Sequence, residues 1–158
     1  MTTLPIPCPK PANLPDRPAP RTSPAPRPEN HRPTILLVDD DAAVRDSVAR
    51  VLTAESMHVV AARGAKDALE HIFRNTPDLV VTDLCMAPLT GWDLIVHLRD
   101  RFPALPIFVV SALPQHTAGV ARCDAEAFFQ KPLDLDALLA AIRRQLAAVG
   151  FGADAGVP

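Results

Sequence analysis

The chain has 158 residues, 48% of them hydrophobic and 22% charged, which predicts one globular domain large enough for a substantial core. Its formal net charge is −2, but residues 1–33 carry five basic and two acidic residues, so subtraction leaves −5 for residues 34–158. An acidic folded part argues against nucleic acid as a partner, because phosphate binding needs a basic face.

Residues 1–33 contain eleven of the eighteen prolines of the chain. Proline fixes φ and has no N–H donor, so we expect a disordered extension with partial polyproline II character. Pro15 and Pro18 form a PxxP pattern that could dock on a partner, but a simple spacer is the favoured interpretation. Residues 150–158 are expected to form a short flexible tail. This leaves residues 34–149 as the predicted domain, with no separate output domain after it.

Within the predicted domain, short apolar runs alternate with segments of helical periodicity. Strands are predicted for the runs at 34–38, 57–62, 78–81, 106–110 and 126–129. Apolar residues recur at helical spacing within 44–52, 65–73, 94–98 and 135–146. Asp134 is the predicted N-cap of the last of these helices. Residues 114–123 have few apolar anchors, so only a short or irregular helix is expected there. The alternation predicts an α/β fold with a doubly wound, five-stranded parallel sheet.

Polar residues follow the predicted strands where ligands bind in such sheets, at the carboxyl ends. They are Asp39, Asp40 and Asp41 after the first strand, Asp83 after the third, Ser111 after the fourth and Lys131 after the fifth. Crowded carboxylates repel one another and favour a hard divalent cation such as Mg²⁺. A carboxylate can also act as a nucleophile toward phosphoryl groups, whose charge a metal ion and a lysine can neutralise. The cluster is therefore suited to phosphoryl acceptance on Asp83.

Each of these residues also has an ordinary structural explanation when it is taken alone. Asp41 is the expected N-cap of the following helix, and Ser111 could simply bond the backbone at a strand end. Lys131 and Pro132 could belong to an unremarkable loop. The joint placement at successive strand ends is what favours a functional site.

Four segments resemble the successive motifs of the response-regulator receiver domain, of the CheY-like superfamily and of the stand-alone, single-domain type. They are ILLVDDDAAVRDSVARVL, PDLVVTDLCMAPLTGWDLI, PIFVVSA and AFFQKP, and together they span nearly all of residues 34–149. The resemblance implies a flavodoxin-like fold of five βα units. It also implies Mg²⁺ bound by Asp39, Asp40, Asp83 and the backbone carbonyl of Cys85, with Asp83 as phosphoacceptor. The remaining implied roles are a hydroxyl donor and switch at Ser111, a lysine before a cis-proline at Lys131, and an aromatic switch at Phe128.

By the same resemblance, the chain would be a receiver of a two-component or phosphorelay pathway and not an enzyme, apart from slow autodephosphorylation. Its expected partners are a sensor histidine kinase or phosphotransfer protein and an unknown downstream protein. A phosphorylation-dependent homodimer is also allowed. The alternative is a receiver fold kept as a non-phosphorylated interaction scaffold. A phosphatase of the haloacid-dehalogenase type is disfavoured, because Cys85 stands where that class needs a second carboxylate.

The sequence also departs from the receiver pattern. Ala87 and Pro88 follow Met86 where Met-Pro is common, and the stretch from Ser111 to Phe128 is shorter than is typical. Asp124 precedes Ala125 where Gly-Ala is usual, which leaves partner choice open. Phe128 replaces the commoner tyrosine and lacks its hydroxyl.

The three cysteines, at positions 8, 85 and 123, form no C-x-x-C metal or redox motif. Reduced thiols in the cytoplasm are the simplest interpretation, and a redox role for Cys85 is disfavoured by the neighbouring carboxylates. No apolar run approaches the roughly 18 residues of a membrane helix, and prolines interrupt the N-terminus where a signal peptide would be apolar. A cytoplasmic protein without a membrane partner is therefore expected.

Overall fold

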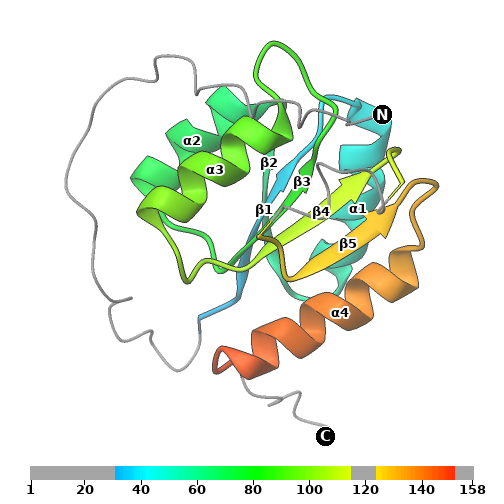
Figure 1. Cartoon of the computed structure of the whole chain (residues 1–158). Helices are drawn as coiled ribbons and strands as arrows, with labels where there is room; N and C mark the ends of the chain where they lie inside the picture. Colours follow the sequence, from blue (N-terminus) through cyan, green and yellow to red (C-terminus); the bar gives the residue numbers. More distant parts are fainter. Residues whose placement is uncertain (1–30, 115–123, 152–158) are drawn as a thin grey trace, which may run out of the picture.

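The computed structural model describes residues 31–114 and 124–151. Five parallel strands form one sheet in the order β2-β1-β3-β4-β5 (Figure 1). The strands are β1 Thr34–Val38, β2 His58–Ala62, β3 Leu79–Asp83, β4 Ile107–Ser111 and β5 Ala127–Gln130. The helices are α1 Ala42–Ala54, α2 Ala65–Arg74, α3 Gly91–Arg101 and α4 Leu135–Ala148. The predicted α/β fold with a doubly wound, five-stranded parallel sheet is confirmed. The expected irregular helix over 114–123 lies almost wholly outside the described residues.

Helices cover both faces of the sheet: α2 and α3 lie on one face and α1 and α4 on the other (Figure 1). Successive strand residues point to opposite faces, so each central strand supplies two cores. In β1, Leu36 and Val38 pack toward α2 and α3, while Ile35 and Leu37 pack toward α1 and α4. This explains why the strands appear in the sequence as continuous apolar runs instead of alternating ones.

Side-chain caps fix where three of the helices begin. Asp41 accepts hydrogen bonds from the N–H groups of Ala43 and Val44 at the start of α1, and Asp134 caps α4 in the same way. Both caps were predicted. The cap of α3 was not: Thr90 and Asp93 form a reciprocal capping box there. These caps satisfy N–H groups that a helix leaves unpaired, and they set the loops that follow β1, β3 and β5.

Among the residues that the structure places, no helix is long and apolar enough to cross a membrane.

The side chain of Arg99 joins α3 to the beginning of two strands. Its Nε donates to the carbonyl of Asp124 at 2.7 Å and its Nη1 to the carbonyl of Leu105 at 2.6 Å. Its Nη2 lies 3.2 and 3.1 Å from the two carboxylate oxygens of Glu126, which in turn accepts the Ile107 N–H at 2.5 Å. The Arg99 side chain is only 13% exposed. Asp124, where the receiver pattern has glycine, thus takes part in an anchor that holds the entry to β5.

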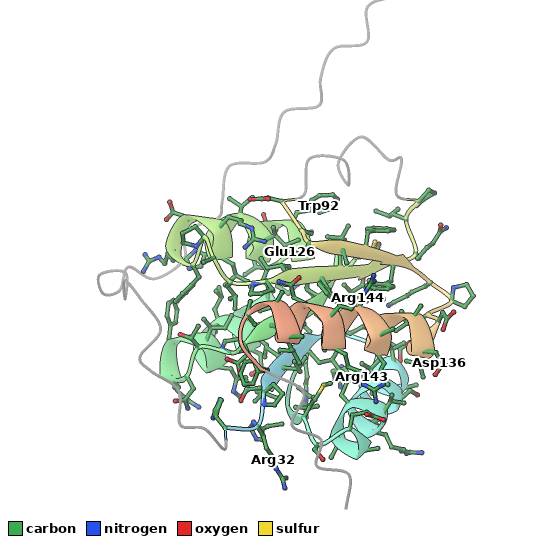
Figure 2. The ribbon with its side chains drawn as sticks, turned by 90° about the horizontal axis from the view of Figure 1, so that it is seen from below. Arg32, Trp92, Glu126, Asp136, Arg143 and Arg144 are labelled. Atoms are coloured by element: carbon green, nitrogen blue, oxygen red, sulfur yellow. The ribbon has the colours of Figure 1, made fainter. Side chains whose placement is uncertain are left out.

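We expect Arg99→Met to lower the free energy of unfolding by about 2–4 kcal/mol, because it leaves two carbonyls without their donor and the half-buried Glu126 carboxylate without its cation. Urea unfolding followed by circular dichroism would measure the loss. Arg144→Met is the control, since Arg144 is exposed on α4 (Figure 2) and its replacement should change stability by less than about 0.5 kcal/mol. Equal stability of the two variants would contradict the anchoring role.

Candidate functional site

Three carboxylates meet at the carboxyl ends of β1 and β3. One oxygen from each of Asp39, Asp40 and Asp83 lies within 4.8 Å of the others. Asp39 is 2% exposed and Asp83 is 5% exposed, whereas Asp40 faces solvent. Because β1 and β3 are neighbours in the sheet, Asp39 and Asp83 lie side by side although they are 44 residues apart in the sequence. The structure therefore brings together the three carboxylates that the sequence analysis assigned to one site.

Lys131 supplies a positive charge between the two buried carboxylates. Its Nζ lies 2.8 Å from Asp39 Oδ2 and 2.7 Å from Asp83 Oδ2. Burial of the ammonium lowers its pKa, but the hydrogen bonds and charges of Asp39 and Asp83 outweigh that effect, so the pKa of Lys131 is raised. Lys131 comes from the loop after β5, where its N–H donates to the Ser111 carbonyl at 2.9 Å and the Lys131–Pro132 peptide is cis, as the resemblance implies.

The backbone after Asp83 is held by contacts on both sides. Asp83 Oδ1 accepts the N–H of Cys85 at 2.9 Å, and the buried Thr82 hydroxyl donates to the Asp83 carbonyl at 2.9 Å. Gly91 donates its N–H to the Leu84 carbonyl at 3.1 Å. A Cβ at position 91 would stand 1.9 Å from the Asp83 carbonyl oxygen, so the start of α3 can touch this strand end only through a glycine. Sequence analysis did not predict this contact.

Ser111 and Cys85 lie on the side of the site toward β4. The Ser111 hydroxyl is completely buried, accepts the Leu113 N–H at 3.2 Å, and lies 3.8 Å from Cys85 Sγ. Cys85 itself is exposed. The thiol therefore stands at the rim of the site beside the hydroxyl, while the backbone of Cys85 belongs to the turn that follows Asp83.

Phe128 lies on β5, which pairs only with β4 and forms the edge of the sheet. Its side chain is partly buried against the core beneath α2 and α3. The next residue, Phe129, points to the opposite core, where its ring centroid is 5.9 Å from that of Phe108. Phe128 is thus separate from the carboxylate cluster and shares with it only the strand that leads to Lys131.

The turn that departs from the receiver pattern keeps Met86 in the core, at 5% exposure. The Ala87–Pro88 peptide, where the turn differs from the receiver pattern, is cis. Sequence analysis did not predict this second cis bond.

The ligand atoms of the cluster suit a hard cation. All three side chains offer carboxylate oxygens, without the nitrogen or sulfur ligands that zinc or copper would favour. Lys131 is in contact with two of the three carboxylates and offsets one negative charge, while the nearby Arg45 guanidinium bonds the Asp39 carbonyl and no carboxylate of the cluster. A divalent cation of the Mg²⁺ type fits both the ligand chemistry and the charge.

Comparison with known proteins identifies the family of the chain. A family model described as the response regulator receiver domain matches residues 35–143. The response regulator MprA of Mycobacterium leprae is 40% identical over 114 residues, which cover 71% of this chain and 50% of that protein. MprA of Mycobacterium avium is 39% identical over 114 residues, with the same coverage of 71% and 50%. The chain thus spans about half the length of the curated relatives it matches.

Solved structures of response regulators have the same fold. A response regulator receiver protein from Pseudomonas putida has a TM-score of 0.67 at 33% identity, over 72% of this chain and 98% of that one. A two-component response regulator from Clostridium difficile has a TM-score of 0.71 at 21% identity, over 75% and 99%, and supports the fold alone. The family model, the relatives and the fold agree, and the chain belongs to the response-regulator receiver domains of two-component systems.

Proposed function

We propose that this chain is a phosphorylation-controlled switch that accepts a phosphoryl group on Asp83. The observation that carries the proposal is the joint geometry of three clustered carboxylates with Lys131 between Asp39 and Asp83. A carboxylate and a lysine in contact provide a nucleophile together with the charge that stabilises its product. The excess negative charge of the cluster is costly in the resting protein, and a bound cation offsets it.

The donor would be a phosphohistidine of a sensor kinase or phosphotransfer protein. An oxygen of the Asp83 carboxylate attacks phosphorus, the P–N bond breaks, and the imidazole leaves with the bonding electron pair and takes up a proton. Asp39, Asp40, Asp83 and the Cys85 carbonyl would hold Mg²⁺, which when bound would supply positive charge to the phosphoryl oxygens. Lys131 is placed to neutralise the added charge on Asp83.

Ser111 and Phe128 would carry the change away from the site. The Ser111 hydroxyl accepts a hydrogen bond from the Leu113 N–H, so its own proton can turn from the weak contact with the Cys85 sulfur at 3.8 Å toward a phosphoryl oxygen. Movement of Ser111 changes the carboxyl end of β4, to which β5 and the half-buried Phe128 are paired. The phosphoryl group thereby shifts the population between two arrangements of this sheet edge, and output follows through contact with another protein.

Intact-protein mass spectrometry after incubation with acetyl phosphate and Mg²⁺ tests the proposal. We expect one added phosphoryl group in the wild type and none in Asp83→Asn, because an amide is not a nucleophile toward phosphorus. Labelling should disappear in EDTA. Asp46→Asn, an exposed substitution on α1, is the matched control and should be labelled like the wild type.

A wild type that takes up no phosphoryl group and binds no Mg²⁺ would instead assign the chain to a scaffold that keeps the receiver fold for binding alone.

A further inference from the structure

Arg45 directs its side chain back over the first turn of α1 toward the acidic site. Side chains on a helix tilt toward its N-terminus, so an arginine in the second turn can reach the loop that precedes the helix. Here Arg45 Nη1 donates to the carbonyl of Asp39 at 2.6 Å. The Arg45 side chain is half-buried, in contrast to that of Arg50 on the same helix, which is exposed.

Asp39 has four polar groups, the N–H, the two carboxylate oxygens and the carbonyl, and each has a hydrogen-bond partner. Its N–H donates to the Ala62 carbonyl at 3.3 Å, and its carboxylate accepts the Asp41 N–H at 2.8 Å and the Lys131 ammonium at 2.8 Å. The bond from Arg45 fixes the fourth group, the carbonyl. The orientation of this peptide sets the direction in which the next residue, Asp40, presents its carboxylate.

The bonds at the Asp39 carboxylate differ from those at its N–H and its carbonyl in what a metal ion would do to them. A cation that binds the Asp39 carboxylate competes with the Lys131 ammonium for the same oxygen atoms. The Asp39 carbonyl is not one of the expected ligands, so the bond from Arg45 can persist in both states. A contact that persists can keep the two ligand residues in place before the metal ion arrives.

We propose that Arg45 is a positioning residue for the divalent-cation site, acting through the Asp39 backbone and not by touching the ion. The inference rests on the proposed function, because it assumes that Asp39 and Asp40 bind Mg²⁺. The charge of Arg45 and its positioning effect change the affinity for a metal ion in opposite directions. A nearby guanidinium repels a cation, whereas the pair of carboxylates that Arg45 orders attracts one. The two effects predict opposite results when the side chain is removed.

Isothermal titration calorimetry with Mg²⁺ on the full chain separates them. We expect Arg45→Met to raise the Kd for Mg²⁺ by about tenfold, the lower end of the range for outer contacts of metal ligands. Arg45→Lys should recover part of the loss, since an ammonium can donate one hydrogen bond. Arg50→Met should bind like the wild type. Urea unfolding of each variant establishes that the fold is intact at the titration temperature.

A Kd that is unchanged or lower in Arg45→Met would overturn the proposal and leave Arg45 as a structural contact or a charge barrier. A lower stability with an unchanged Kd would overturn it in the same way. Failure of the proposed function gives a different result: the wild type itself would then bind no Mg²⁺, and the positioning role would fall with it.

Discussion

Replacement of Lys131 by methionine should lower the free energy of unfolding of the metal-free protein by about 3–5 kcal/mol, the range for removing one partner of a buried ion pair. The Asp39 and Asp83 side chains are 3% and 6% exposed, so neither can regain full hydration when the ammonium is lost. Urea unfolding in EDTA measures the effect. In saturating Mg²⁺ the difference between wild type and Lys131→Met should shrink, because the cation supplies positive charge to the same carboxylates.

The pH dependence of stability gives a second test of the same contact. The pKa of Lys131 is raised above its ordinary value of 10.5 by Asp39 and Asp83. A group whose pKa is higher in the folded state stabilises the protein below its unfolded pKa and loses that contribution as the pH rises through the folded value. Wild-type stability should therefore fall more steeply above about pH 10.5 than that of Lys131→Met.

Lys66→Met on the exposed surface of α2 controls for the general loss of a lysine charge and should follow the wild type. If Lys131→Met were as stable as the wild type in EDTA, the prediction that the ammonium stabilises the buried Asp39 and Asp83 carboxylates would be wrong.

The placement of the carboxylate cluster could be predicted because it depends on a simple rule. Asp39 and Asp83 each end a continuous apolar run, and parallel strands bring their carboxyl ends to one edge of the sheet. The same local logic predicted Asp41 and Asp134 as helix caps, since a cap contacts residues only two or three positions away.

Contacts between distant segments could not be predicted from the sequence. Arg99 contacts Asp124 and Glu126, which are 25 and 27 residues away, and two of its acceptors are backbone carbonyls that any residue type would offer. Arg45 likewise binds a carbonyl. No pattern of residue types records such bonds, because their geometry depends on how α1 and α3 pack against the sheet. The switch role of Phe128 stays a prediction, supported by its half-buried position on the edge strand.

Gly91→Ala should be the most damaging alanine substitution among the glycines that the structure describes. The new Cβ would stand 1.9 Å from the Asp83 carbonyl oxygen and 2.8 Å from the Leu84 Cα, and both are backbone atoms that cannot rotate away. Either α3 must move from the end of β3 or the turn after Asp83 must deform, and each breaks the Gly91–Leu84 hydrogen bond. We expect a loss of more than about 3 kcal/mol in the free energy of unfolding, at the upper end of overpacking effects.

Gly64→Ala is the matched control, because no atom lies within 4 Å of the Cβ it would add and its φ of 176° is open to any residue. It should change stability by no more than about 1 kcal/mol. If Gly91→Ala still folds, for example at low temperature, acetyl phosphate labelling should be reduced, since the displaced turn carries both Asp83 and the Cys85 carbonyl. If Gly91→Ala kept the stability and the labelling of the wild type, the turn after Asp83 would be able to deform at little cost in free energy. The close approach of α3 to Asp83 would then have no part in shaping the site.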